Sequence, residues 1–215
     1  MKMIKGAVVA SLMAASSAAF AQTAILGPGN VGITTLEVSV SGNTITLFET
    51  WGTSGPGSVL FRGLEANVNY TIIKNIKNLT GTSWTSFANE LLPPGNVVPG
   101  QPAFIPPNFQ PSDDGDGLSF AQGSGLPRTS TIFGSLAVDE LAGRDYLDFS
   151  GGLWGTDVNG EITFGLRDNA AANQPFLLFQ RPNEFTSVVP VPAALPLLLS
   201  GLGIFGFLAR RRNKA

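Results

Sequence analysis

Hydrophobic and polar residues alternate with a period of two along several short stretches in the middle of the chain. Residues 33–40 and 44–49 alternate on either side of Gly42-Asn43, a dipeptide that favours a tight turn, and together they predict a β-hairpin. Residues 84–92 fit either a strand or a short helix. Further strands are expected at residues 59–61, 68–76, 118–120, 131–136, 145–149, 161–166 and 176–179. About nine short strands separated by Gly, Pro, Asn and Asp turns predict an all-β body, an antiparallel β-sandwich of two sheets.

One stretch, at about residues 89–117, breaks this pattern with seven prolines and few regularly spaced apolar residues. A loop of this length inside a compact domain is usually functional or disordered. We therefore expect a β-sandwich domain at residues 22–188 that carries a long loop rich in Pro and Gly.

The first 21 residues have the pattern of a secretory signal peptide. Lys2 and Lys5 precede an apolar stretch of small residues at 6–18, and residues 19–21 form a small-x-small cleavage site before Gln22. The stretch is short and rich in Ala and Ser, so it suits a bilayer-spanning anchor poorly. We predict a cleaved signal peptide at residues 1–21 and export by the general secretion machinery.

The other end of the chain predicts a single transmembrane helix. Residues 194–209 carry no charge over 16 positions, which is about 24 Å of helix at ~1.5 Å per residue. A basic tail at residues 210–215 follows at once and is expected to stay on the cytoplasmic side of the inner membrane. The alternative, a buried helix of the sandwich domain, leaves the basic cluster at the chain end unexplained.

Three features stand in order in residues 189–215: a short motif with prolines, an apolar helix and an arginine cluster. The motif and the cluster consist of Val189, Pro190, Val191, Pro192, Ala193, Arg210, Arg211 and Arg212. This arrangement resembles the PEP-CTERM class of protein-sorting signals, most closely its VPLPA-CTERM variant, which usually has Leu at the position of Val191. Two body segments, 77–87 and 139–152, are also similar to the sandwich domains of PEP-CTERM proteins, the first through the pattern Asn-x-Thr-Gly followed by Trp-x-x-Phe.

The resemblance implies a processing partner and a destination. Such tails are substrates of exosortase, a transpeptidase-like membrane enzyme of Gram-negative bacteria that is expected to cut near the proline-containing motif. The family is associated with exopolysaccharide, the biofilm matrix and the cell surface. The resemblance therefore implies a protein that is anchored in the inner membrane at least transiently and then reaches the surface or the extracellular matrix.

The amino-acid composition excludes several kinds of catalytic and metal site in the body. The chain has no Cys and no His, which removes disulfides, thiolate metal sites, cysteine nucleophiles and the Ser-His-Asp triad. The net charge of the whole chain is −2, but the body at residues 22–188 has 7 basic and 15 acidic residues and a net charge of −8. An acidic body disfavours polyanionic partners, so we expect no binding of nucleic acid.

The densest acidic cluster of the body is a candidate calcium site. Asp113, Asp114 and Asp116 lie in a short Asp/Gly segment, and carboxylate oxygens are the ligands that Ca²⁺ prefers. The spacing resembles the start of an EF-hand loop, but the closing Glu is missing. The alternative is a solvated Asp-Gly turn. No other metal or cofactor is expected.

Two further candidate sites concern carbohydrates. Trp51 and Trp154 are each followed by Gly and are candidates for an exposed platform that stacks on sugar rings; the alternative is that they fill the core. A pair of carboxylates is the requirement for a glycosidase. The acidic residues available for such a pair are Glu49, Glu65, Glu90, Asp139 and Glu161, and nothing in the sequence pairs any two of them.

The sequence thus predicts an exported surface or matrix protein with no catalytic activity, processed at its C-terminus by an exosortase. One alternative is a carbohydrate-binding module for exopolysaccharide. A second alternative is a hydrolase of matrix glycans, which the lack of His and Cys disfavours.

Overall fold

The computed structural model places the body of the chain and leaves both ends outside the description. It describes residues 23–95, 105–112, 116–139, 145–169 and 174–183. The predicted signal peptide and the predicted sorting signal therefore lie outside the described residues.

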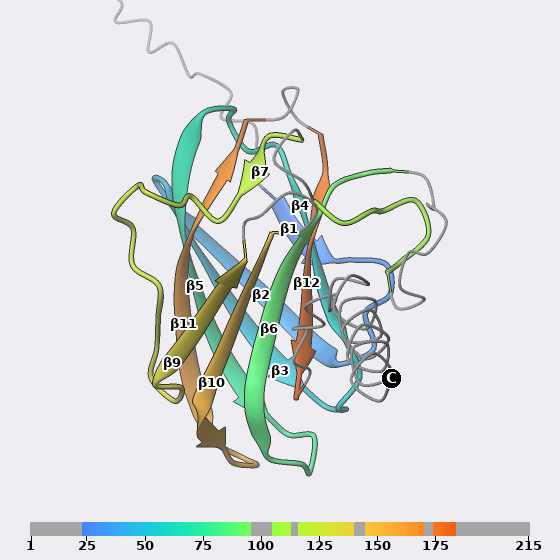
Figure 1. Ribbon diagram of the computed structural model, residues 1–215. Helices are drawn as coiled ribbons and strands as arrows, with labels where there is room; N and C mark the ends of the chain where they lie inside the picture. The colour runs from blue at the N-terminus through green and yellow to red at the C-terminus, as the bar shows by residue number, and fades with distance from the viewer. Residues whose placement is uncertain (1–22, 96–104, 113–115, 140–144, 170–173, 184–215) are drawn as a thin grey trace, which may run out of the picture.

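The described residues form strands and no helix, which confirms the all-β prediction (Figure 1). The strands are β1 (Thr23–Leu26), β2 (Ile33–Ser41), β3 (Thr44–Trp51), β4 (Gly57–Arg62), β5 (Val68–Asn78), β6 (Trp84–Leu92), β7 (Leu118–Ser119), β8 (Thr129–Ser130), β9 (Ser135–Asp139), β10 (Tyr146–Trp154), β11 (Asn159–Asp168) and β12 (Phe176–Pro182). Residues 84–92, which fitted a strand or a helix, are a strand.

The strands make two sheets that pack face to face. Sheet A has the order β1-β4-β12-β6-β10-β9, and sheet B has the order β2-β3-β5-β11-β7, with β8 also paired to β11. In Figure 1, β6, β9 and β10 of sheet A lie in front of sheet B. The strand pairs are antiparallel except for β3 and β5, which are parallel. These two strands run the same way because β4, between them in the chain, crosses to sheet A.

The prediction of a strand at residues 131–136 is wrong, because a turn occupies most of that segment. β8 ends at Ser130 and β9 begins at Ser135. The Ser130 hydroxyl accepts hydrogen bonds from the backbone N–H groups of Ile132 and Phe133, each at 3.1 Å. A local side chain that satisfies these donors competes with strand pairing. Phe133 turns inward as a result, and its ring lies 5.9 Å from the ring of Trp154.

Aromatic side chains fill the space between the sheets. Trp51 of sheet B lies 5.4 Å from Trp84 of sheet A between ring centroids, and Trp84 lies 5.6 Å from Trp154. The Phe87 ring completes the cluster at 5.5 Å from Trp51. All four side chains are fully buried. Each such aromatic pair adds about 0.5–1.5 kcal/mol beyond the area that it buries, so this cluster stabilises the packing of the two sheets.

Asn78 joins two turns at one end of the sandwich. Its side-chain amide donates to the backbone carbonyls of Thr82 at 2.9 Å and of Trp154 and Gly155 at 3.2 Å. Its carbonyl oxygen accepts from the backbone N–H of Thr80 at 3.0 Å and from the Thr80 hydroxyl at 2.7 Å. The Asn-x-Thr-Gly pattern is therefore explained by a buried polar side chain that holds the β5–β6 turn against the β10–β11 turn.

The proline-rich segment begins later than expected, and its described part packs on the outer face of sheet A. β6 continues to Leu92, so the described loop begins after that residue and not at 89. Pro94 pairs with Phe109 in an isolated β-bridge. Ile105 and Phe109 pack onto a second apolar cluster on sheet A that contains Leu60, Leu92, Leu177 and Phe179. The described part of this loop thus closes an apolar surface.

Candidate functional site

The tryptophans expected to form a sugar platform are in the core. Trp51 and Trp154 each have 0% of their surface exposed, so neither indole is available to a sugar ring. Both occupy inward positions of their strands, and both ring N–H groups are used inside the protein. Trp51 Nε1 donates to Glu49 Oε2 at 3.0 Å, and Trp154 Nε1 donates to the carbonyl of Val158 at 3.0 Å. This corrects the expectation of an exposed platform and supports its alternative.

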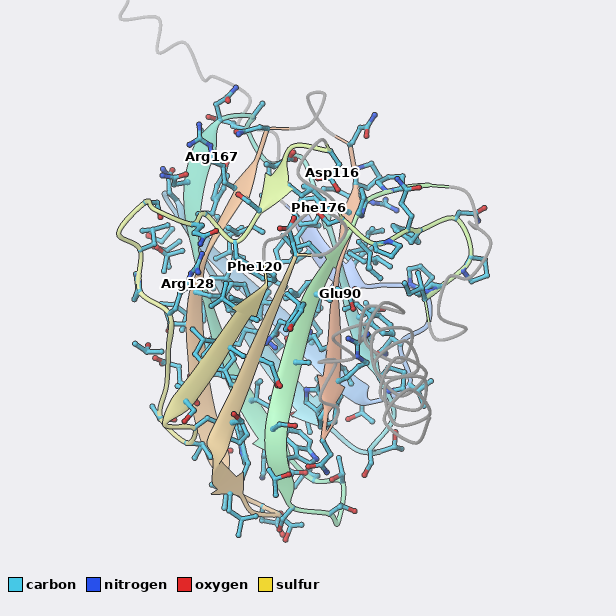
Figure 2. The ribbon with its side chains drawn as sticks, viewed as in Figure 1. Glu90, Asp116, Phe120, Arg128, Arg167 and Phe176 are labelled. Atoms are coloured by element: carbon cyan, nitrogen blue, oxygen red, sulfur yellow. The ribbon has the colours of Figure 1, made fainter. Side chains whose placement is uncertain are left out.

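The expected calcium ligands are only partly within the described residues. Asp113 and Asp114 lie outside them. Asp116 lies beside Phe176 in a small pocket at one end of the molecule (Figure 2). Its Oδ1 accepts the backbone N–H of Leu118 at 2.7 Å. The described residues contain no group of three or more acidic side chains able to hold a metal ion, and the calcium site stays a prediction.

The expected sorting motif, Val189 to Ala193, and the arginine cluster, Arg210 to Arg212, lie outside the described residues. Among the helices and strands that the structure does describe, there is no helix long and apolar enough to cross a membrane.

The acidic residues considered for a catalytic pair are dispersed over different layers. Glu49 points into the core from β3, and Glu161 lies on the outer side of sheet B. Glu90 lies on β6 of sheet A, where its Oε2 is 2.8 Å from Nη2 of Arg181 (Figure 2). Glu49 and Glu161 both border one groove on sheet B, but the Glu49 carboxylate is bound in the core by Trp51 and Gln180, so these three residues form no carboxylate pair.

A groove of about 500 Å³ lies on the outer face of sheet B. Its floor consists of side chains that alternate outward along four neighbouring strands, and the register places them in two rows. The first row is Glu37, Phe48, Asn75 and Glu161, and the second row is Thr35, Thr50, Lys77 and Asn159. Thr131 adds to the wall beside β11.

The two rows run across the strands and not along them. Adjacent strands lie about 4.8 Å apart, so a row that crosses four strands is about 14 Å long. Each position in the first row is directly opposite the next one in the ladder, from β2 through β3 and β5 to β11. The groove is therefore an elongated track, suited to an extended ligand.

Phe48 is the apolar centre of an otherwise polar track. It is 45% exposed, and its register partners on both sides, Glu37 and Asn75, are polar. A single exposed phenylalanine is common on protein surfaces. Here it lies on the floor of a groove, between hydroxyl, amide and carboxylate groups. This combination presents one flat apolar surface and many hydrogen-bonding groups to the same ligand.

Local hydrogen bonds fix the wall of the groove next to β11. The backbone N–H of Thr131 donates to the carbonyl of Glu161 at 3.0 Å, and the backbone N–H of Glu161 donates to the Thr131 hydroxyl at 2.9 Å. The Thr163 hydroxyl donates to Glu161 Oε1 at 3.3 Å. The Glu161 carboxylate is thus held at the end of the first row before any ligand binds.

Directly beneath the groove, a buried polar network ties sheet B to sheet A. Lys74 Nζ, from β5, donates to Asn89 Oδ1 at 3.0 Å and to Gln180 Oε1, both on sheet A. It lies 3.7 Å from Glu49 Oε2, and Gln180 Nε2 donates to Glu49 Oε1 at 3.1 Å. The ammonium group also lies 4.4 Å from the centroid of the Phe87 ring. Burial lowers the pKa of Lys74 to about 8, and the Glu49 carboxylate opposes this shift.

The network is enclosed and so does not itself form a ligand site. The side chains of Glu49, Lys74, Asn89 and Gln180 are all at least 98% buried. Most of their polar atoms bond to one another or to Trp51, and Asn89 Nδ2 is buried without a hydrogen-bond partner. Because Glu49 and Lys74 alternate with Phe48, Thr50 and Asn75 on the same strands, the network holds the floor of the groove in place. The sequence itself indicates this buried network, since Glu49 and Lys74 both occupy inward positions of alternating stretches.

Comparison of the chain with protein-family models, with curated proteins and with solved structures finds no match.

Proposed function

We propose that the protein is an exported surface or matrix protein whose β-sandwich binds a polysaccharide in the sheet B groove and catalyses no reaction. The observation that carries the proposal is the first row of the groove, in which Phe48 lies between Glu37 and Asn75 across neighbouring strands. A sugar ring has an apolar face and an edge of hydroxyl groups. An exposed aromatic ring supports the apolar face, and polar side chains around it bind the hydroxyls.

The spacing of the carboxylates in the groove favours binding over hydrolysis. Glu37 and Glu161 stand at opposite ends of the first row, three strand spacings apart. That separation is about 14 Å at the backbone, whereas glycosidases hold their two carboxyl groups about 5–10 Å apart. The remaining charged side chain in the two rows is Lys77. The groove therefore has the groups that recognise a sugar and lacks a catalytic pair.

The proposal of export and sorting is based on the sequences at the two ends of the chain. The signal-peptide pattern at residues 1–21 and the tail at 189–215 support delivery to the envelope and processing by an exosortase-type enzyme in the inner membrane. We expect the mature protein from its own cells to have a mass that starts at Gln22 and ends between Val189 and Ala193. Deletion of residues 210–215 should cause mis-sorting. A mature mass that still includes residues 210–215 would reject the processing step.

Polysaccharide binding is tested with the full-length protein extracted in mild detergent. Its migration is compared in native gels with and without the exopolysaccharide of the producing cells, and with a neutral glucan. We expect Phe48→Ala to weaken retardation about tenfold or more, because the aromatic contact contributes at least about 1.4 kcal/mol. Leu153→Ala is the matched control, since Leu153 is 65% exposed on β10 of sheet A. Equal retardation of both variants, or no retardation of the wild type, would reject the groove as the site.

A further inference from the structure

One side of the sandwich ends in two edge strands that lie against each other. β1 is the outermost strand of sheet A and β2 is the outermost strand of sheet B. β1 and β2 also contact each other between the sheets. β2 is nine residues long, and in the part of the chain that the structure describes its strand partner is β3. Its other edge is a row of backbone groups that another strand can pair with.

The hairpin geometry identifies which residues of β2 present these groups. Ser41 pairs with Thr44 across the two-residue turn Gly42-Asn43, and Gly42 has a positive φ of 55°. A two-residue hairpin closes on a hydrogen-bonded pair, and such pairs alternate along an antiparallel ladder. The residues between them, Leu36, Val38 and Val40, therefore direct their backbone N–H and C=O groups away from β3.

In the described part of the chain, this edge has few of the devices that usually prevent strand addition, although its register with β3 shifts once, between Ile33 and Thr35. From residue 33 to residue 41, β2 has no Pro, no Lys and no Arg, and its one charged residue is Glu37. Exposed large hydrophobic side chains also gather on this side of the molecule. They are Ile25 and Leu26 of β1, Val31 in the loop that follows, and Val40 of β2, each at least 41% exposed. A long, weakly charged edge of this kind favours pairing with another strand.

We propose that β2 pairs antiparallel with β2 of a second copy of this chain, about a two-fold axis at Val38. In this register Leu36 faces Val40 of the second copy, and the outward-directed backbone groups of Leu36, Val38 and Val40 meet their counterparts in hydrogen-bonded pairs. Glu37 then lies opposite Ser39 of the second copy. A register centred on Glu37 would place two carboxylates directly opposite each other, which is destabilising. In the register centred on Val38, the one charged residue of β2 faces a hydroxyl and not a second carboxylate. Two copies of β2 can therefore pair without opposing like charges, and this favours a second copy as the partner.

The pairing also has a consequence for the groove, although it does not depend on ligand binding there. Thr35 and Glu37 on β2 form one end of each row of the groove. Pairing through β2 continues sheet B into sheet B of the second copy and places both grooves on one face, offset along the strands because Glu37 lies opposite Ser39 of the second copy. The dimer would present two such tracks, one from each copy, on the same face.

The register is tested by cross-linking in the full-length chain, which has no native cysteine. Chains with Glu37→Cys and chains with Ser39→Cys are purified in mild detergent, alone and mixed, and oxidised with copper-phenanthroline. Non-hydrogen-bonded antiparallel partners lie about 4.5 Å apart between Cα atoms, within reach of a disulfide. We expect the mixture to give several times more reducible dimer than either variant alone. More dimer from Glu37→Cys alone would overturn the register, and no dimer above a Leu153→Cys control would overturn the pairing.

A second variant separates pairing from folding. Val40→Lys places a charge opposite Leu36 of the second copy, while Val138→Lys places the same charge on β9, an edge strand of sheet A whose Val138 is 39% exposed. By sedimentation, we expect wild type and Val138→Lys to be dimers and Val40→Lys to be a monomer with unchanged circular dichroism. A monomeric wild type, or a dimeric Val40→Lys, would overturn the proposal even where polysaccharide binding is intact.

Discussion

Lys74 and Asn89 face each other across the interior, one from each sheet, with Lys74 Nζ 3.0 Å from Asn89 Oδ1. The ammonium group is completely buried, and the Glu49 carboxylate lies 3.7 Å from it. A buried charge of this kind is tolerated only because its partners satisfy it. The network therefore fixes how the two sheets are positioned relative to each other.

Removal of the Lys74 charge should be strongly destabilising. Lys74→Met leaves the Glu49 carboxylate buried without its counter-ion, which costs about 3–5 kcal/mol. The double variant Lys74→Met with Glu49→Gln should recover much of this loss, because no uncompensated charge remains. Urea unfolding of the two single variants and the double variant measures the coupling. Lys77→Met, on the exposed side of the same strand, should change the free energy of unfolding by less than about 0.5 kcal/mol; a similar loss in both lysine variants would contradict this role.

Asn78→Ala should destabilise the end of the sandwich where two turns meet. The substitution removes the hydrogen bonds to Thr80, Thr82, Trp154 and Gly155 and leaves buried carbonyls without donors. We expect a loss of about 3 kcal/mol in thermal or urea unfolding, since each unsatisfied buried group costs about 1–3 kcal/mol. Asn75→Ala, in the groove on the same strand, is the control and should be close to neutral. A neutral Asn78→Ala would show that the turns are held by other contacts.

Asp148 should make the stability of the protein depend on pH in the mildly acidic range. Burial raises the pKa of Asp148 from 3.8 to about 6, and the guanidinium of Arg181 partly opposes this shift. An acid with a raised pKa binds more protons in the folded state, so its contribution to stability declines as the pH rises from about 4 to about 6.

Asp148→Asn tests this linkage directly. The neutral amide removes the cost of burying a charge, so we expect the variant to be more stable than wild type by about 1 kcal/mol at pH 7 and equal to it near pH 4. Urea unfolding at several pH values gives both curves. The control Leu153→Ala, which changes no titratable group, should keep the wild-type pH dependence. If Asp148→Asn were less stable than wild type at pH 7, the pairing with Arg181 would outweigh the burial.

Gly160 should not tolerate a side chain. A Cβ atom at this position would lie 2.5 Å from Cζ2 of Trp154 and 2.7 Å from Cγ1 of Ile132. Trp154 is locked in the aromatic core and cannot move aside, so Gly160→Ala should cost about 1–3 kcal/mol of stability, as overpacking usually does. Gly134→Ala is a suitable control, because a Cβ there meets only the Gly151 carbonyl oxygen at 3.6 Å. Equal thermal stability of the two variants would contradict this packing.

Local patterns predicted the strands well, because each strand has its own alternation and its own turn residues. The hairpin at Gly42-Asn43 and the strands around residues 68–76, 145–149, 161–166 and 176–179 follow from such patterns. β1 was missed because its four residues, Thr23–Leu26, are too few to show a period. At residues 131–136, the prediction failed because hydrogen bonds from the backbone N–H groups of Ile132 and Phe133 to the Ser130 hydroxyl stabilise a turn, despite the β-propensity of these residues.

The candidate site depends on contacts between strands that are distant in the sequence. Phe48 meets Asn75 only because β3 and β5 are parallel, and no local pattern encodes this arrangement. Trp51 was expected at an exposed strand end because Gly follows it. Its inward position on β3 instead places it in the core. Alternation along each strand therefore predicts the strands without showing which residues of different strands lie together.

The position of β12 constrains the order in which the molecule can assemble. β12 is the last described strand, yet it lies between β4 and β6 in the middle of sheet A. Until Phe176–Pro182 arrives, the edges of β4 and β6 that face each other have no partner, and Gln180 is missing from the network around Lys74. Such pairing of distant segments makes folding slow. A growing chain therefore stays incompletely folded until this strand has been synthesised.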